Sequence, residues 1–382
     1  MARVIVREET FDPSFVPPKL VRRDQEFGLL LRRYRDSLGK GLPHHQLLTG
    51  GIGSGKTVLA KRIADELARG PRLHDLTTLP IYINCWRRAT DRTVLLELLR
   101  GVGVSLPDRG YSQSEMLDVL EQGIRKAPRH LFIILDEVSA LVRQETKLVY
   151  LLSRPSEVRL GSVSLFLVAP EDVLPYLDAA SRSSFGVTHR LQLAKYDRAA
   201  IVDILRYRAE LGLRGGTFSD EVLDQVARTA AGSGDVRFAL EILLGAARLA
   251  DAAGAGEIEP EHVRAARGSI YPTVTESKLE ELPVQSLLVL LAVARSLKGP
   301  RTTAPTERVR KLYGGLAEEY GTKAVSRVTF WRTVKELERE GLLATEPGRE
   351  GESARLSMDE VPASFLATLL ESRAGESAPA KR

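Results

Sequence analysis

The stretch that most constrains this chain is the octapeptide GGIGSGKT at residues 50–57, which matches the phosphate-loop pattern G-x-x-x-x-G-K-[ST] at every fixed position. Its glycines let the backbone curl so that successive N–H groups point inward as an anion-binding nest. Residues 45–49 are typical of a short strand and residues 58–67 of an amphipathic helix. We therefore expect a strand, a phosphate loop and a helix whose positive dipole end faces the ligand.

This motif predicts a nucleotide site for ATP or ADP with Mg²⁺. Lys56 is placed to reach the β- and γ-phosphates, and the hydroxyl of Thr57 can ligate the metal ion. The predicted nucleotide contacts in this stretch are Gly50, Gly51, Ile52, Gly53, Ser54, Gly55, Lys56, Thr57 and Val58.

A second motif, LFIILDE at residues 131–137, ends an apolar strand with two carboxylates. Ligand sites of α/β proteins lie at the carboxyl ends of their strands, so this is where a second set of groups is expected. Asp136 is placed to hold Mg²⁺ through its water shell and therefore belongs to the predicted nucleotide and metal site. Glu137 is predicted to polarise the water that attacks the γ-phosphate.

The pattern along the rest of the chain changes from alternating strands and helices to helices alone. Apolar runs at 79–85, 163–169 and 189–193 complete a predicted five-stranded parallel sheet between helices, an α/β fold. We expect the run at 79–85 to be a buried strand. Four helices follow, predicted at 198–211, 220–231, 236–250 and 261–267. They predict a small helical domain after the sheet.

Three further helices, predicted at 284–297, 306–320 and 326–340, precede a strand, a glycine-rich turn and a returning strand at 342–357. This is the pattern of a winged helix. Cations cluster at the start of its third helix, whose N-terminal half is expected to face the DNA major groove. The predicted DNA contacts of this module are Lys323, Ser326, Arg327, Thr329, Arg332 and the wing residues Arg349 and Arg355. A winged helix that binds only proteins remains the alternative.

Composition limits the class of protein and its compartment. The 382 residues carry a net charge of +5 with a pI near 9.2, a mildly basic balance that permits a nucleic-acid partner without demanding one. Cys85 is the only cysteine, which excludes an internal disulfide and a cysteine-based zinc site. With no apolar run near 20 residues and no signal peptide, we expect a cytoplasmic, nucleoid-associated protein without a membrane partner. Asn84 is the only asparagine, a bias associated with proteins of thermophiles.

The chain as a whole resembles the AAA+ replication initiators. Four features carry this resemblance: the phosphate loop, the strand ending in Asp136 and Glu137, the stretch GDVR at 234–237 and the terminal winged helix. More narrowly, the chain is similar to archaeal origin-recognition and helicase-loader proteins from about Phe11 to about Leu370. The arm FVPPKLVRRDQE at 15–26 adds to this similarity. Within the arm, Arg22 and Arg23 fit either a solvated surface or a role beside the adenine or ribose.

The resemblance implies further site residues and exposes two departures. Arg237 is similar to the lid arginine that reaches the γ-phosphate, in a catalytic and nucleotide-binding role. The first departure is at the end of the fourth strand, where the family has Ser-Asn to align water and this chain has Ala169-Pro170. The second is in the finger segment, where Ala180 stands at a position that is commonly arginine, with Arg182 two residues away. We therefore expect slow hydrolysis. The family also touches DNA from an ATPase-domain loop, here 101–111, which implies contacts from Arg100 and Arg109. A solvated loop is the alternative.

We therefore predict a weakly ATPase-active replication initiator in which bound ATP or ADP acts as a conformational switch. Its expected domains are an AAA+ core with the N-terminal arm (1–195), a helical lid (196–270), a winged helix (271–370) and a disordered tail (371–382). Expected partners are double-stranded origin DNA, paralogous initiators, the replicative helicase and other copies on DNA. The alternatives are a P-loop regulator whose winged helix binds promoter DNA or proteins, and a clamp-loader-like or chaperone-like ATPase.

Overall fold

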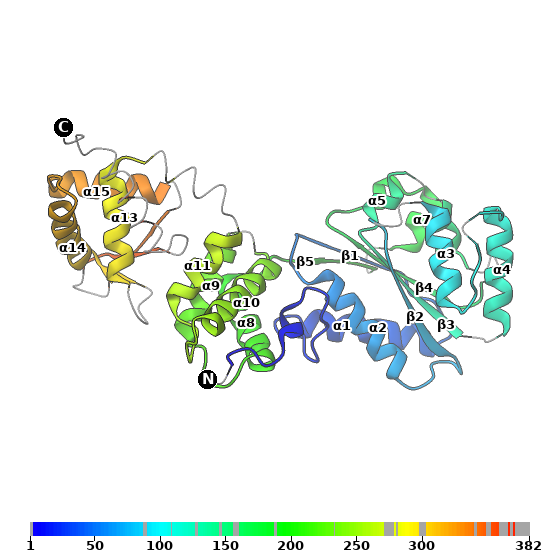
Figure 1. The fold of residues 1–382 in the computed structure, drawn as a ribbon. Helices are drawn as coiled ribbons and strands as arrows, with labels where there is room; N and C mark the ends of the chain where they lie inside the picture. The colour runs from blue at the N-terminus through cyan, green and yellow to red at the C-terminus, as the bar shows by residue number, and fades with distance from the viewer. Residues whose placement is uncertain are drawn as a thin grey trace. The chain divides into compact units, whose positions relative to one another are not determined.

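The structure, a computed structural model, divides the chain into two compact units (Figure 1). The first comprises Ser14–Tyr196 with Ser233–Val236, and the second Met1–Pro13, Asp197–Gly232 and Arg237–Arg382. The residues described are 3–86, 90–107, 109–126, 129–144, 147–155, 160–186, 189–232, 234–270, 279, 282–297, 303–339, 342–348, 353–358, 366 and 370. The predicted tail at 371–382 lies outside them.

A five-stranded parallel sheet forms the centre of the first unit, as predicted. Its strands are β1 (Gln46–Gly50), β2 (Thr77–Asn84), β3 (Arg129–Asp136), β4 (Val163–Ala169) and β5 (Arg190–Leu193). They lie in the order β2-β3-β4-β1-β5. Because β4 separates β1 from β3, the end of β4 lies between the phosphate loop and the Asp136 carboxylate.

Helices cover both faces of this sheet because alternate strand residues are apolar on both sides. Leu47, Ile133 and Leu165 belong to the core that includes α3 (Asp91–Gly101) and α4 (Gln113–Lys126). Leu48 and Phe132 belong to the core under α1 (Asp24–Gly39) and α2 (Lys56–Arg69), on the opposite face (Figure 1). The short helices α5 (Ser139–Val142), α6 (Lys147–Ser153), α7 (Ala179–Ser184) and η2 (Leu174–Tyr176) complete the unit.

The strand β2 differs from the expectation of a buried strand. It lies at the edge of the sheet and pairs on one side only, with β3. Ile81 and Ile83 are buried, whereas the alternate residue Tyr82 is 38% exposed. The alternation of buried and exposed residues with a period of two indicates a half-buried strand, whereas the length of the apolar run suggested a fully buried one.

In the second unit, four helices form the lid: α8 (Arg198–Gly212), α9 (Asp220–Ala231), α10 (Val236–Ala252) and α11 (Pro260–Ile270). The first residues pack here rather than with the ATPase core, contrary to the expected grouping. The Val4 N–H donates to Asp251 Oδ1 at 2.6 Å, and the Arg208 guanidinium donates to the carbonyl of Thr10, within η1 (Glu8–Phe11). These hydrogen bonds join residues 247 and 198 positions apart, so the local sequence could not predict where this segment packs.

The winged helix contains α13 (Val284–Ser296), α14 (Thr306–Glu319), α15 (Arg327–Arg339), β7 (Ala344–Glu346) and β8 (Arg355–Ser357). A further strand, β6 (Ala304–Pro305), was not predicted and pairs with β8 in the order β6-β8-β7. The almost entirely buried α13 forms the centre of the core, and Phe330 and Val334 attach α15 to it. No helix in the described ranges has the length and apolarity needed to cross a bilayer.

Candidate nucleotide and DNA sites

The phosphate loop takes the backbone shape that its glycines allow. Gly50, Gly53 and Gly55 have φ values of 152°, 71° and 89°. A Cβ on Gly53 would lie 2.0 Å from Asp235 Oδ1, and one on Gly55 would lie 2.8 Å from the Tyr196 hydroxyl. Both positions therefore require glycine for space as well as for conformation.

Two side chains make this loop suited to an anion. Lys56, at the start of α2, is 8% exposed, and its Nζ donates to the carbonyls of Gly50 at 2.7 Å and Gly51 at 2.8 Å. The Ser54 hydroxyl is buried and finds no hydrogen-bond partner among the described residues. An ammonium group, an unsatisfied hydroxyl and a left-handed backbone in one loop fit a polyphosphate.

Asp136 joins the end of β3 to the start of α2. Its Oδ2 accepts hydrogen bonds from the hydroxyls of Thr57 and Tyr82, each at 2.8 Å. The predicted metal residues are thus brought into contact, and their hard oxygen atoms suit Mg²⁺. Tyr82 was missed by the sequence reasoning. Its partial burial, followed by the charge of Asp136, raises the pKa of this phenol, which remains a hydrogen-bond donor.

Glu137 follows Asp136 with a φ of 53°, a left-handed conformation that non-glycine residues rarely adopt. Its N–H donates to Asp136 Oδ1 at 3.0 Å. Beside β3, β4 ends at Ala169 as expected, and Pro170 follows it. Asn84 lies on the opposite side of β3, paired in register with Asp136.

The nearby Cys85 is buried. Its burial, followed by the negative charges of Asp136 and Glu137, raises the pKa of its thiol to about 12.

Arg23 lies in the interior of the first unit and not on a solvated surface. Its guanidinium donates to the Ser54 carbonyl at 3.2 Å, the Ala194 carbonyl at 2.5 Å and the Tyr196 hydroxyl at 3.1 Å. It also pairs with Glu26 at 2.8 Å and stacks 4.2 Å from the centroid of the Tyr196 ring. One arginine therefore connects the N-terminal arm and the end of β5 to the phosphate loop.

We expect Arg23→Lys to lower the affinity for ATP about tenfold, or about 1.4 kcal/mol. A lysine keeps the charge, but its single ammonium cannot hold the Ser54 and Ala194 carbonyls and the Tyr196 hydroxyl in one plane. Equilibrium nucleotide titration measures the effect. Arg22→Lys is the matched control because Arg22 is exposed and adjacent. Equal affinities of the two variants would contradict this prediction.

The remaining predicted ATPase-domain and lid residues are exposed. Arg237 is the second residue of α10 and is exposed. Arg182 is exposed on α7. Arg100 pairs with Glu97 at 2.8 Å on the surface, and Arg109 is exposed in the loop after α3. The apolar residues of that loop, Val102, Val104 and Leu106, pack on the core of the first unit.

The predicted DNA contacts of the winged helix divide by their surroundings. Lys323, Arg327 and Arg332 are exposed: Lys323 precedes α15, Arg327 begins it and Arg332 lies in its second turn. Ser326 Oγ accepts from the Thr329 N–H at 3.3 Å, so these two residues form a cap of the helix. On β8, Arg355 Nε donates to Thr303 Oγ1 at 2.8 Å. Arg349 lies outside the described residues.

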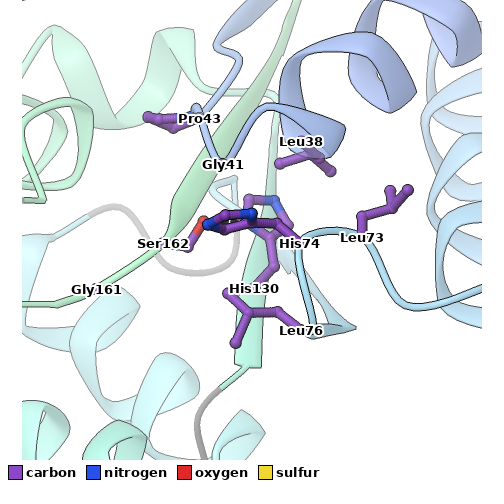
Figure 2. Close-up of a pocket in the computed structure, with 9 residues that line it drawn as sticks. All are labelled: Leu38, Gly41, Pro43, Leu73, His74, Leu76, His130, Gly161 and Ser162. Carbon is purple, nitrogen blue, oxygen red and sulfur yellow. Dashed lines mark hydrogen bonds between the residues drawn. The ribbon is translucent and has the colours of Figure 1, made fainter.

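A separate cavity of about 220 Å³ lies at the amino end of the sheet, opposite the nucleotide residues. Figure 2 shows His74 and His130 beside Ser162 within it, with Leu38, Leu73 and Leu76 around them. His130 Nδ1 and Ser162 Oγ are 2.7 Å apart. The described residues contain no group of three or more His, Cys, Asp or Glu that could hold a metal ion.

Three buried histidines at the amino end of the sheet, His44, His45 and His130, are expected to make the first unit sensitive to acid. Burial, together with the charges of neighbouring histidines, lowers the pKa of His44, His45 and His130 to about 4. His45 Nδ1 accepts from the Leu165 N–H at 3.1 Å, a bond that protonation of this nitrogen would remove. The unfolded chain, with histidine pKa values of about 6.5, binds these protons first, so acid favours unfolding.

We therefore expect the free energy of unfolding to fall as the pH is lowered from 7 to 5. Between about pH 6.5 and about pH 4 these histidines are protonated in the unfolded chain and largely neutral in the folded protein, so each lowering of the pH in this window favours unfolding. The loss is on the order of 2 kcal/mol per histidine at pH 5. Urea unfolding at constant ionic strength measures it, and His130→Gln should flatten the dependence. Equal stability at pH 7 and pH 5 would refute the prediction.

Comparisons with known proteins agree with this architecture. Three family models match in chain order: an AAA domain at residues 43–177, a Cdc6 AAA+ ATPase-type lid domain at 202–268, and a CDC6 C-terminal winged-helix domain at 277–367. The matches therefore cover strands β1 to β4 of the sheet, most of the lid helices and the winged helix.

Individual proteins are similar over almost the whole chain. A putative ORC1-type DNA replication protein 1 of Thermoplasma acidophilum is 28% identical over 353 residues, 91% of this chain and 98% of its own length. The crystal structure of Cdc6p from Pyrobaculum aerophilum superposes with a TM-score of 0.80 at 26% identity, covering 98% of this chain and 99% of that one. The Aeropyrum pernix ORC1 protein in complex with DNA superposes with a TM-score of 0.62 at 25% identity, covering 99% and 98%.

Proposed function

We propose that this chain, which belongs to the archaeal ORC1/Cdc6 family of AAA+ proteins, is a DNA replication initiator that binds origin duplex through its winged helix. The observation that carries the proposal is the order of AAA domain, Cdc6-type lid and Cdc6-type winged helix along one chain. The DNA complex of the similar Aeropyrum pernix ORC1 protein supports the same partner.

Nucleotide binding belongs to the first unit. The loop from Gly50 to Thr57 would hold the phosphates, with Lys56 on the β- and γ-phosphates and the Ser54 hydroxyl as a further donor. Thr57 and Asp136 would hold Mg²⁺, which neutralises charge on the phosphates when it is bound. Bound ATP or ADP would then act as the switch between conformations, with Arg237 of the lid as the residue that senses the γ-phosphate.

We expect Glu137→Gln to keep ATP affinity while slowing hydrolysis at least about a hundredfold. The amide keeps the shape of the side chain and loses the basicity that polarises water. Wild-type turnover itself should fall below about 1 s⁻¹, the lower end for ordinary enzymes, because Ala169-Pro170 supplies no side chain to align water. Phosphate release under saturating ATP measures both, with the surface variant Glu66→Gln as control. Unaltered turnover in Glu137→Gln would remove Glu137 as the base.

Duplex binding belongs to the exposed side of α15. Arg327 and Arg332 would contact base edges or phosphates in the major groove, with Lys323 beside them. Arg100 and Arg109 would touch DNA from the ATPase domain. Paralogous initiators, the replicative helicase and further copies of the chain are the partners proposed for assembly on DNA.

The rival function is a P-loop regulator whose winged helix binds promoter DNA or only proteins. Footprinting on duplex from the chain's own replication origin, on promoter duplex and on random duplex of equal length separates the two, with ATP and with ADP. We expect the origin fragment to be protected at protein concentrations that leave the promoter and random fragments unprotected. Preference for promoters, or no preference among duplexes, would favour the rival.

A further inference from the structure

One apolar side chain stands out on the surface of α15. Val328 is 80% exposed, more than any other large hydrophobic residue in the described part of the chain. It lies in the first turn of the helix, next to Arg327. A β-branched residue gains nothing for helix stability at an exposed position, because its side-chain freedom is restricted there. Neither packing nor helix propensity therefore accounts for valine at 328.

The helical arrangement places Val328 in the middle of the exposed face. At 3.6 residues per turn, Val328, Arg332 and Lys335 lie in one row along the axis. Phe330, Val334 and Leu337 are buried on the opposite side, in the winged-helix core. Arg327 and Arg332 thus lie beside the valine on the open face, where cations suit the phosphates on either side of a DNA groove. Lys335, one turn further along, is paired with Glu338 at 2.6 Å.

We infer that Val328 reads thymine: its isopropyl group contacts the C5-methyl group of a thymine in the major groove. This inference rests on the proposed duplex binding through α15. The thymine methyl is the apolar feature of the major-groove edge in unmodified DNA, and apolar side chains contact it. Residues in the first turn of a recognition helix are those that reach base edges. Val328 is therefore a specificity-determining residue, while Arg327 and Arg332 supply charge beside it.

Thymine-to-uracil substitution tests this contact because it removes the methyl group and leaves base pairing intact. Each thymine within the protected duplex is replaced in turn, and the dissociation constant is measured at fixed salt. For the wild-type protein, we expect one position or a few to weaken binding about fourfold, the value of one buried methyl group. Val328→Ala should weaken binding to the thymine duplex by a similar factor and lose its response to uracil at the same positions.

Controls separate this contact from folding and from charge. Val284→Ala, the same change at an exposed valine of α13, should retain the wild-type response to uracil. Val328→Thr keeps the β-branched shape but replaces a methyl with a hydroxyl group, and should lose the response partly. The salt dependence of binding should be unchanged in all Val328 variants, because no phosphate contact is removed.

The outcomes separate a failure of the thymine contact from a failure of duplex binding by α15. If Val328→Ala responds to uracil at every position as the wild type does, while Arg327→Ala and Arg332→Ala still weaken binding, the thymine contact is wrong and duplex binding by α15 stands. If cytosine-to-5-methylcytosine substitution strengthens Val328-dependent binding and no uracil substitution weakens it, the thymine assignment is overturned in favour of a methylated cytosine. If the wild-type protein binds no duplex, the proposed function fails and the inference fails with it.

Discussion

Lys56→Ala is expected to lower ATP affinity at least a hundredfold, or about 3 kcal/mol, while the fold is retained. Lys56 is the one side chain of the loop that carries positive charge to the β- and γ-phosphates, and in this structure its Nζ lies against the carbonyls of Gly50 and Gly51. Alanine removes that charge and has the highest propensity for the helix that begins there. The charge lost is therefore the main consequence of the change.

Equilibrium titration with a fluorescent ATP analogue measures this loss, and circular dichroism confirms that the variant is folded. Lys126→Ala, at the exposed end of α4, removes the same charge elsewhere and should bind as the wild type does. If Lys56→Ala bound ATP with unchanged affinity, the nucleotide site could not be the loop at residues 50–57.

Removal of the winged helix by truncation at Ser277 is expected to abolish most duplex affinity, by at least a hundredfold, and to leave ATP affinity unchanged. The cations at the start of α15 are lost, whereas Lys56, Asp136 and Arg237 all precede the cut. Gel shifts and nucleotide titrations on the same preparation measure the two activities. Full origin affinity without the winged helix would move the DNA site into the ATPase domain.

The full-length variant Arg327→Ala with Arg332→Ala is the companion to this truncation, because it keeps the domain in place. A contact with a base edge contributes roughly 1–3 kcal/mol of discrimination, and each lost phosphate contact lowers the salt slope by about one. The double variant should therefore lose duplex affinity, specificity or both, and its loss of affinity should be smaller than that caused by the truncation. A double variant with wild-type affinity and salt slope would mean that α15 does not dock in the groove.

Local patterns in the sequence were enough to determine the elements and the principal motifs. The loop at residues 50–57 depends on glycine spacing, and the strand ending in Asp136 depends on an unbroken apolar run, so both could be predicted from neighbours in the chain. The same holds for the five parallel strands, the lid helices and the winged helix, because hydrophobic periodicity reports the buried face of each element. Slow hydrolysis and the role of Arg237 stay predictions.

Tertiary structure alone decided which distant side chains meet these motifs. Arg23 reaches the carbonyl of Ser54, 31 positions away, and the hydroxyl of Tyr196, 173 positions away. Tyr82 reaches Asp136 because β2 pairs with β3, and it is 38% exposed on this edge strand. Thr303 holds Arg355 through an unpredicted strand pairing. Sequence spacing determines what a residue can form with its neighbours along the chain, whereas sheet order and packing determine its distant partners.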